Sequence, residues 1–209
     1  LTATDFITVS SGTSLSIPAS KTLRLEASTV NLFAPIAYAD ATSVLAGIPA
    51  TVNVNPGARI QNGVDVAAAG ATVIVKTGTY TEDVTIGKTL NLASLPGGVI
   101  DLTGSVIANQ PIGISGSLRS TDSQTYNNTL TLTGDTSLQT GAAPASLTLG
   151  QVTGRDHDLT LTFNNAAASP VNISQITGVR NFVTAGKGIT TVGETFITTG
   201  FQTYGAPLV

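Results

Sequence analysis

The sequence predicts an all-β protein, and three observations carry this prediction. Threonine, whose β-branched side chain suits a pleated strand, accounts for 34 of the 209 residues. Short runs that alternate apolar and polar residues recur about every 8–12 residues, and Gly, Asn, Asp or Pro separates them. Only 10% of the residues are charged although 41% are hydrophobic. Hydroxyl and amide side chains must therefore solvate the surface of a Val, Ile and Leu interior.

The alternating runs identify the expected strands in chain order. They are Phe6–Val9, Ser14–Ile17, Thr22–Leu25, Val73–Val75, Val84–Ile86, Thr89–Leu92, Leu130–Leu132, Leu147–Leu149, Leu159–Leu161 and Val171–Ile173. Each has the period of two that a strand with one buried face requires. The spacing of the runs suits a sandwich, a barrel or a solenoid.

One segment departs from the strand pattern and predicts a short α-helix near residues 57–69. Ile60, Val64 and the alanines 67 and 68 lie on one face of such a helix. Asn55 is the expected cap, Pro56 suits the first turn, and a glycine at position 70 suits the end. Gly63 in the middle weakens the helix by about 1 kcal/mol, so packing must hold it. Residues 37–50 form a second interruption, which we expect to be a loop or a small helix.

The second half of the chain, residues 121–209, carries a degenerate repeat. Gln124–Tyr126 recurs as Gln202–Tyr204, 78 positions later, and each glutamine is followed after six residues by a leucine, Leu130 or Leu208. Seventy-eight residues exceed one solenoid turn but suit three or four turns of roughly 20–25 residues. We therefore expect residues 1–209 to be a single β-helix domain or an excised segment of a longer repeat protein.

Composition excludes several functions. The net charge is −3 and no basic block occurs, which disfavours nucleic acid and anionic membranes as partners. Cysteine is absent, so no disulfide or thiolate metal site can form, and the single histidine excludes a two-histidine metal site within one chain. No apolar run approaches the roughly 20 residues of a membrane span, so no membrane insertion is expected.

Residues 55–93 carry a helix–strand signature that resembles right-handed parallel β-helix proteins of the pectin-lyase-like class. The predicted helix ends in alanines and a glycine, an apolar strand follows, and Gly78-Thr79-Tyr80 leads to Val84-Thr85-Ile86. The resemblance implies a fold class: all-β, a right-handed parallel β-helix, or solenoid, with one short helix. More than 50 residues precede the helix, whereas in many relatives it caps the amino end. We therefore expect it across or beside a running stack of strands.

The recurring Thr- and Gly-rich runs and the two Gln-Thr-Tyr copies resemble repeats of large secreted bacterial adhesins of the filamentous-haemagglutinin type. This resemblance implies a non-enzymatic structural or adhesive rod segment, extracellular or on the bacterial cell surface. The expected partners are neighbouring repeats or other copies, end to end, as in a filament, and glycans of a host or matrix. The alternatives are a carbohydrate-active enzyme of the same fold or a glycan- or ice-binding module.

The acidic residues provide the candidates for catalysis or metal binding. Arg155-Asp156-His157-Asp158 is the densest charged segment, and it reads either as a metal or acid–base site or as a polar turn after a glycine. Glu82, Asp83 and Asp101 are the other acidic candidates. Apart from Asp156 and Asp158, no two acids have the i, i+2 spacing that places paired carboxylates on one strand face. We favour the turn, and expect no catalytic, cofactor-binding or metal residues.

The remaining candidates favour structural roles. Tyr126 and Tyr204 could stack on sugars, but packing is the better interpretation in a chain with four Tyr and no Trp. Gly97–Gly98 and residues 186–188 are expected turns, because neither has the strand–loop–helix context of a phosphate loop. Thr-x-Thr pairs are frequent but irregular, so an ice-binding ladder is the weakest alternative.

Overall fold

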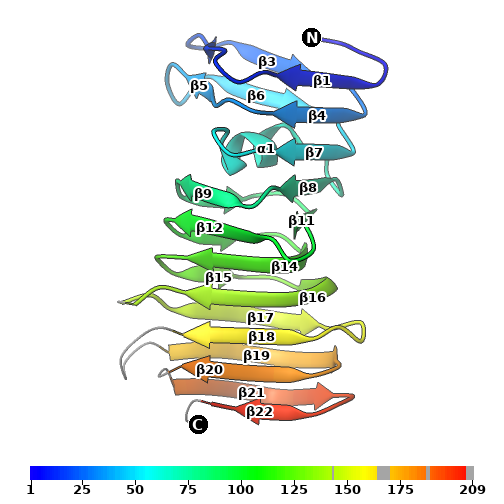
Figure 1. The fold of residues 1–209 in the computed structure, drawn as a ribbon, viewed down its shortest axis with the longest axis vertical. Helices are drawn as coiled ribbons and strands as arrows, with labels where there is room; N and C mark the ends of the chain where they lie inside the picture. Colours follow the sequence, from blue (N-terminus) through cyan, green and yellow to red (C-terminus); the bar gives the residue numbers. More distant parts are fainter. Residues whose placement is uncertain (143, 164–169, 187–188, 206–209) are drawn as a thin grey trace.

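The computed structural model describes residues 1–142, 144–163, 170–186 and 189–205. The chain winds into a parallel β-solenoid of about 8 coils stacked along one axis, with β1 at one end and β22 at the other (Figure 1). Strands make up 58% of the structure and helix 4%. The expected all-β parallel β-helix with one short helix is confirmed.

Three faces line the solenoid, and strands of successive coils pair in parallel on each face. Coil length varies: Ile112 pairs with Leu130, 18 positions later, and Val152 pairs with Ile176, 24 positions later. We call the coils before the short helix the upper coils and those after it the lower coils. Several strands in the lower coils bend at a corner of the solenoid and so contribute to two faces.

Face A runs through the whole stack. It consists of β1 (Phe6–Val9), β4 (Thr29–Leu32), β7 (Thr51–Val54), β8 (Thr72–Val75), β11 (Leu90–Ser94) and one part each of β14 (Ile112–Ser120), β16 (Leu130–Thr140), β17 (Leu147–Thr153), β19 (Pro170–Val179) and β21 (Ile189–Thr198).

Faces B and C complete the lower coils. Face B consists of β9 (Gly78–Thr81), β12 (Val99–Thr103), β18 (Leu159–Phe163), β20 (Phe182–Gly186), β22 (Gln202–Tyr204) and the other parts of β14 and β16. Face C consists of β10 (Val84–Ile86), β13 (Val106–Ala108), β15 (Gln124–Tyr126) and the other parts of β17, β19 and β21. In the upper coils two separate pairs stand in their place: β2 (Leu15–Ile17) with β5 (Ile36–Tyr38), and β3 (Thr22–Leu25) with β6 (Val44–Gly47).

Alternation along the strands builds the core. In β4 and β7 the burial pattern alternates between half-exposed and buried, so Val30, Leu32, Val52 and Val54 point inward while threonine and asparagine point out. The inward residues of successive coils stack on one another, and each coil buries the apolar surface of the next.

The helix α1 (Ile60–Val66) lies inside the stack, below β6 and beside β7 (Figure 1), and it also contacts β10. It takes the place of strands in one coil. It interrupts two faces and leaves only face A continuous. The expected apolar side is confirmed, since Ile60 and Val64 are buried. Asn62 and Gly63 are buried as well, because coils cover the helix from above and below.

Two neighbouring amide side chains of α1 replace the hydrogen bonds of the missing strand. Asn62 accepts from the N–H of Ile36 at 2.8 Å and donates to its carbonyl at 3.1 Å. Gln61 accepts from the N–H of Thr85 at 2.8 Å and donates to its carbonyl at 3.1 Å. One residue on each side of the helix, Ile36 of β5 and Thr85 of β10, thereby has both its backbone N–H and its C=O paired.

Two local predictions were wrong. Asn55 does not cap α1: its side chain donates to the Leu32 carbonyl at 3.1 Å, and the first helical N–H groups bond to Glu82 of the next coil instead. Residues 37–50 are not a loop or a small helix, because they contain the end of β5 and all of β6. By contrast, all ten alternating runs lie in or overlap strands.

The two Gln-Thr-Tyr segments occupy different faces. The first forms β15 on face C, and the second forms β22 on face B. The repeat in sequence therefore does not place its two copies at equivalent positions of the coil. Leu208 lies outside the described residues.

Candidate functional site

The outer side of face A shows how the threonines line up. Thr29, Thr51 and Thr72 are in register, and so are Thr131, Thr153 and Thr177 further down the same column. Residues 91 and 113, an asparagine and a glycine, separate the two groups. The hydroxyl column is thus interrupted and does not form one regular ladder along the rod.

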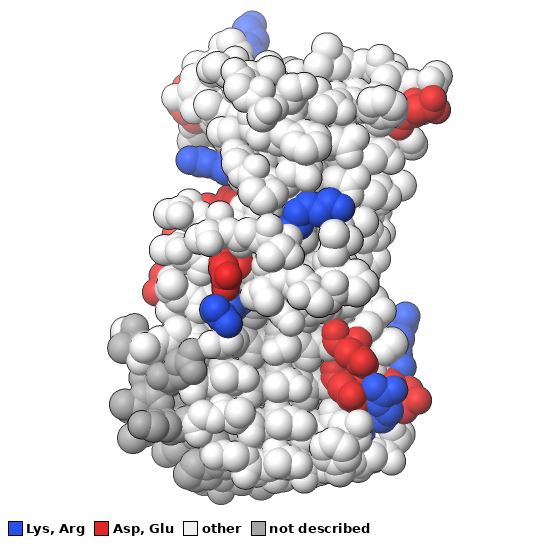
Figure 2. Space-filling model, in the orientation of Figure 1, with Lys and Arg blue, Asp and Glu red and all other residues white. Residues whose placement is uncertain are grey.

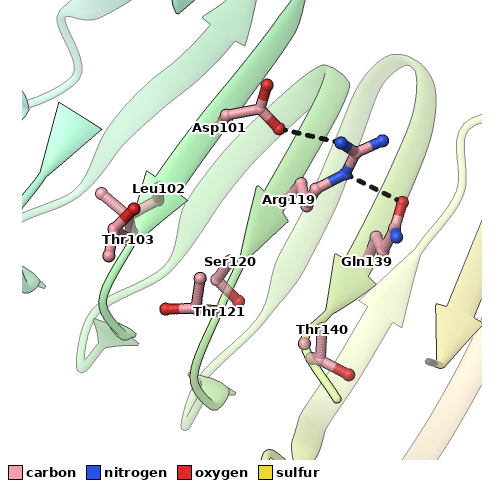
Figure 3. Close-up of a pocket in the computed structure, with 9 residues that line it drawn as sticks. Asp101, Leu102, Thr103, Arg119, Ser120, Thr121, Gln139 and Thr140 are labelled. Atoms are coloured by element: carbon pink, nitrogen blue, oxygen red, sulfur yellow. Dashed lines mark hydrogen bonds and ion pairs between the residues drawn. The ribbon is translucent and has the colours of Figure 1, made fainter. Parts of the chain in front are cut away.

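Face B carries a row of three polar side chains on neighbouring strands (Figure 3). Arg119 lies between Asp101 and Gln139: its Nη1 is 3.3 Å from Asp101 Oδ1, and its Nε donates to Gln139 Oε1 at 3.2 Å. Thr103 and Thr121 border the same shallow cavity of about 140 Å³. We call the side chains of Asp101, Arg119 and Gln139 the Asp101–Arg119–Gln139 row.

The chemistry of this row suits hydrogen bonding more than catalysis. Asp101 is the only carboxylate that lines the cavity, so no acid–base pair is present there. Arg119 shares its charge with Asp101, and its side chain is 54% exposed. Hydroxyl, amide and charged groups side by side can hold the hydroxyls of an uncharged polar ligand, at the strength of exposed hydrogen bonds.

The segment Arg155–Asp158 forms a turn, as expected, and its first two residues have left-handed φ values of 49° and 61°. Together with the side chains of Asp135 and Arg180, this segment forms a cluster of charges at one edge of the lower coils, which we call the charged corner (Figure 2). Arg180 joins two acids there: its Nε lies 2.8 Å from Asp158 Oδ1, and its Nη2 lies 3.2 Å from Asp135 Oδ1. The Nδ1 of His157 lies 3.7 Å from the same Asp135 oxygen.

The electrostatics of this corner are those of a surface ion-pair network. The hydrogen bond from Arg180 is the main reason that the pKa of Asp158 lies below its usual value. Asp135 and Asp158 each accept from Arg180 and from a backbone N–H group of a neighbouring coil, and Asp156 accepts from the Thr199 hydroxyl at 3.0 Å. Within the described part of the chain, no three His, Asp or Glu side chains group closely enough to hold a metal ion.

The other acidic candidates lie apart from one another and have structural partners. Glu82 is half-buried and accepts from the N–H groups of Ile60 and Gln61 at the start of α1. Burial raises its pKa, and these hydrogen bonds counteract the rise in part. Asp83 is exposed and accepts from the N–H and hydroxyl of Ser105, both at 2.8 Å, which lowers its pKa.

The four tyrosines do not form a sugar-stacking platform. Tyr80 and Tyr126 are buried, Tyr38 donates to Asp65 of α1, and Tyr204 packs against Phe182 with ring centroids 6.0 Å apart. Burial raises the pKa of Tyr80 to about 12. Tyr126 and Tyr204, the two tyrosines expected to pack, both do so.

The expected glycine turns have mixed outcomes. Gly97 lies in a turn with a φ of 72°, as expected. Gly186 ends β20, and residues 187 and 188 lie outside the described residues.

Sequence reasoning missed Arg119, Gln139, Asp135 and Arg180. Each meets a partner one or two coils away. Arg119 lies 18 positions after Asp101 and 20 before Gln139. Arg180 lies 22 positions after Asp158 and 45 after Asp135. Local motifs cannot reveal such pairs, because stacking brings them together.

Two further observations bear on function. No helix in the described ranges is both long and apolar enough to cross a membrane. Comparison with known proteins finds no matching family model, curated protein or solved structure.

Proposed function

We propose that this chain is a non-enzymatic rod segment of a secreted or surface-attached bacterial protein, with a structural or adhesive role. The observation that carries the proposal is face A, whose parallel strands run without a break from β1 to β21. Each strand of face A between β1 and β21 is paired with a strand on both sides, and the apolar interior is continuous. Such a stack resists bending and extension along its axis.

The outer surface supports the same proposal. Threonine and asparagine point outward along strands such as β4 and β7, and several of the charges sit in ion pairs, among them those of the charged corner at Arg180. A surface of this kind keeps a rod soluble without a strong field that attracts nucleic acid or anionic lipid. The narrower assignment to adhesins of the filamentous-haemagglutinin type, outside the cell, rests on the resemblance of the sequence.

Force spectroscopy on the full chain, held by its two ends, tests the mechanical role. We expect extension in successive steps, each releasing about one coil, or roughly 7 nm for about 20 residues. The steps arise because each coil contacts only its neighbours. Extension at negligible force, without steps, would contradict a role as a rigid spacer.

A second candidate function is glycan binding at the Asp101–Arg119–Gln139 row, which the polar cavity beside it favours. Titration of neutral and acidic oligosaccharides into the wild type and Arg119→Ala tests it. Arg24→Ala is the matched control, because Arg24 is also exposed and paired with an acid, Glu26, in an upper coil. Binding that only Arg119→Ala loses supports this function, and cleavage of the bound glycan would instead support the enzyme alternative.

A further inference from the structure

One hydrogen-bonded chain of side chains occurs twice within the described residues. In the first copy, Gln124 donates to the hydroxyl of Ser120 at 3.0 Å, and Tyr126 donates to Gln124 at 3.0 Å. In the second copy, Gln202 donates to the hydroxyl of Thr198 at 3.0 Å and accepts from Tyr204 at 2.7 Å. We call this arrangement the hydroxyl–Gln–Tyr network.

The two copies differ in what covers them. In the first, both Gln124 and Tyr126 are fully buried, because β17 lies in register beneath them with Leu147 opposite Gln124 and Leu149 opposite Tyr126. The backbone carbonyl of Ser146 accepts from the N–H of Gln124 at 2.9 Å. A strand of sequence Ser-Leu-Thr-Leu therefore buries the first network.

Among the described residues, the second network lies on the last strand of face B. Gln202 is exposed and Tyr204 is half-buried, and β20 is the only strand paired with β22 in the part of the chain that the structure describes. The N–H of Phe182 in β20 donates to the Phe201 carbonyl, and Gly205 donates to the Thr184 carbonyl. Because strand groups alternate in direction, the N–H and C=O groups of residues 202 and 204 point away from β20.

Apolar side chains accompany this edge. Phe182, Phe196 and Tyr204 form an aromatic cluster at the same end, with the first two ring centroids 4.8 Å apart. Phe201 and Ile197 are 59% and 56% exposed. Unpaired strand groups beside apolar surface are the features that invite another strand.

The opposite end of the same chain presents a strand like the one that buries the first network. Ser14-Leu15-Ser16-Ile17 has the pattern of Ser146-Leu147-Thr148-Leu149, and within the described ranges β2 pairs with β5 alone. Leu15 points toward the core and is only partly buried. Leu1 and Phe6, at 68% and 60% exposure, lie in this end of the rod.

We propose that the β22 edge is a docking surface for β2 of a second copy of this chain, so that copies stack head to tail. The docked strand covers Gln202 and Tyr204 as β17 covers Gln124 and Tyr126. The contact joins two different surfaces, so it is heterologous and propagates into an open filament. The inference rests on the proposed rod function and adds how rods associate.

Light scattering and electron microscopy of the full chain over a hundredfold concentration range test the docking. The key variant is Gln202→Lys, which places a charge on the inner side of the edge, where docking would bury it without a partner. We expect it to lower the association constant about a hundredfold or more. The matched control is Thr203→Lys, which adds the same charge one residue away on the outer side of β22 and should still associate. Circular dichroism confirms that both variants are folded.

The direction of stacking is tested by mixing. Gln202→Lys keeps an intact β2 end, so a small share of it added to wild type should end growing rods and shorten them, whereas Thr203→Lys should not. A wild type that is monomeric at every concentration overturns the proposal. Equal association of Gln202→Lys and wild type also overturns it, because another surface then makes the contact. Neither result alters the stepwise extension expected of a single rod, so the two proposals fail separately.

Discussion

At the scale of single residues, polar groups inside the solenoid matter more than the charges outside it. Gln124 has no exposed surface, and its amide is satisfied by Ser120, by the Gln139 carbonyl at 2.8 Å and by Tyr126. The ion pairs of the charged corner are largely exposed and contribute little. A buried group that loses its partner is costly because water cannot replace it.

Tyr126→Phe and Tyr204→Phe form a matched pair that tests this argument. Tyr126→Phe leaves the buried Gln124 oxygen without its donor, so we expect a loss of about 1–3 kcal/mol in the free energy of unfolding. Tyr204→Phe removes the same bond beside the exposed Gln202, where water substitutes, and should cost under about 1 kcal/mol. Denaturant titrations of monomeric protein measure both, and equal losses would refute the distinction.

At the scale of elements, α1 is held by side chains of other coils more than by its own sequence. Glu82 satisfies its first N–H groups, and Lys88 donates to the carbonyls of Asp65 and Ala67, each at 2.9 Å. The N-cap residue Arg59 makes no side-chain capping bond. Because isolated helices of this length are unstable in water, the helix depends on the coils around it.

Gly63→Ala should destabilise the chain even though alanine is the better helix former. A Cβ at position 63 would lie 2.5 Å from Val54 Cγ2 and 3.3 Å from Val73 Cγ1. Overpacking of about 1–3 kcal/mol then exceeds the gain in helix propensity of about 1 kcal/mol. Gly87→Ala is the control, since its Cβ would meet no atom within 4 Å. Thermal unfolding of both variants decides, and a more stable Gly63→Ala would contradict the packing argument.

The pH dependence of stability around α1 has a predictable sign. Burial raises the pKa of Glu82 above 4.5, so the ionised carboxylate is disfavoured in the folded chain. The stability of wild type relative to Glu82→Gln is therefore greatest below about pH 4.5 and falls as the pH rises through the folded pKa.

The neighbouring acid supplies a control of opposite sign. The pKa of Asp83 is lowered by Ser105, so wild type relative to Asp83→Asn loses stability as the pH falls through the folded pKa. Urea titrations of the three proteins at acidic and neutral pH measure both trends. The same sign for the two variants would contradict these assignments.

At the scale of the whole molecule, α1 divides the rod into two parts that differ in continuity. All three faces are continuous in the lower coils, whereas only face A crosses the helix to the upper coils. Stability in a solenoid is a sum over coils and the interfaces between them. The interface at α1 lacks two of its three strand ladders, so it is the expected site of partial opening.

Hydrogen exchange should resolve this difference. We expect the amides of β3, β5 and β6 to exchange through openings of lower free energy than the amides of β13, β15 and β17. The amides of the upper coils exchange more easily because these coils can separate at α1 while the strand ladders of the lower coils stay paired. Exchange measured at several denaturant concentrations gives both free energies. A single common value would mean that the rod opens as one unit.

The sequence by itself determined the all-β class, the positions of ten strands and the buried side of the helix. Alternation in a strand and the three-to-four-residue spacing in a helix are local properties, so Val84–Ile86 and the Ile60–Val64 face can be read from neighbours in the chain. Only the tertiary structure decided which residues meet between coils. The contacts of Asn62 with Ile36, of Arg180 with Asp158 and of Arg119 with Asp101 join residues about one coil apart. Coil length varies along this chain, so no fixed spacing predicts those neighbours, and the stacking register alone sets them.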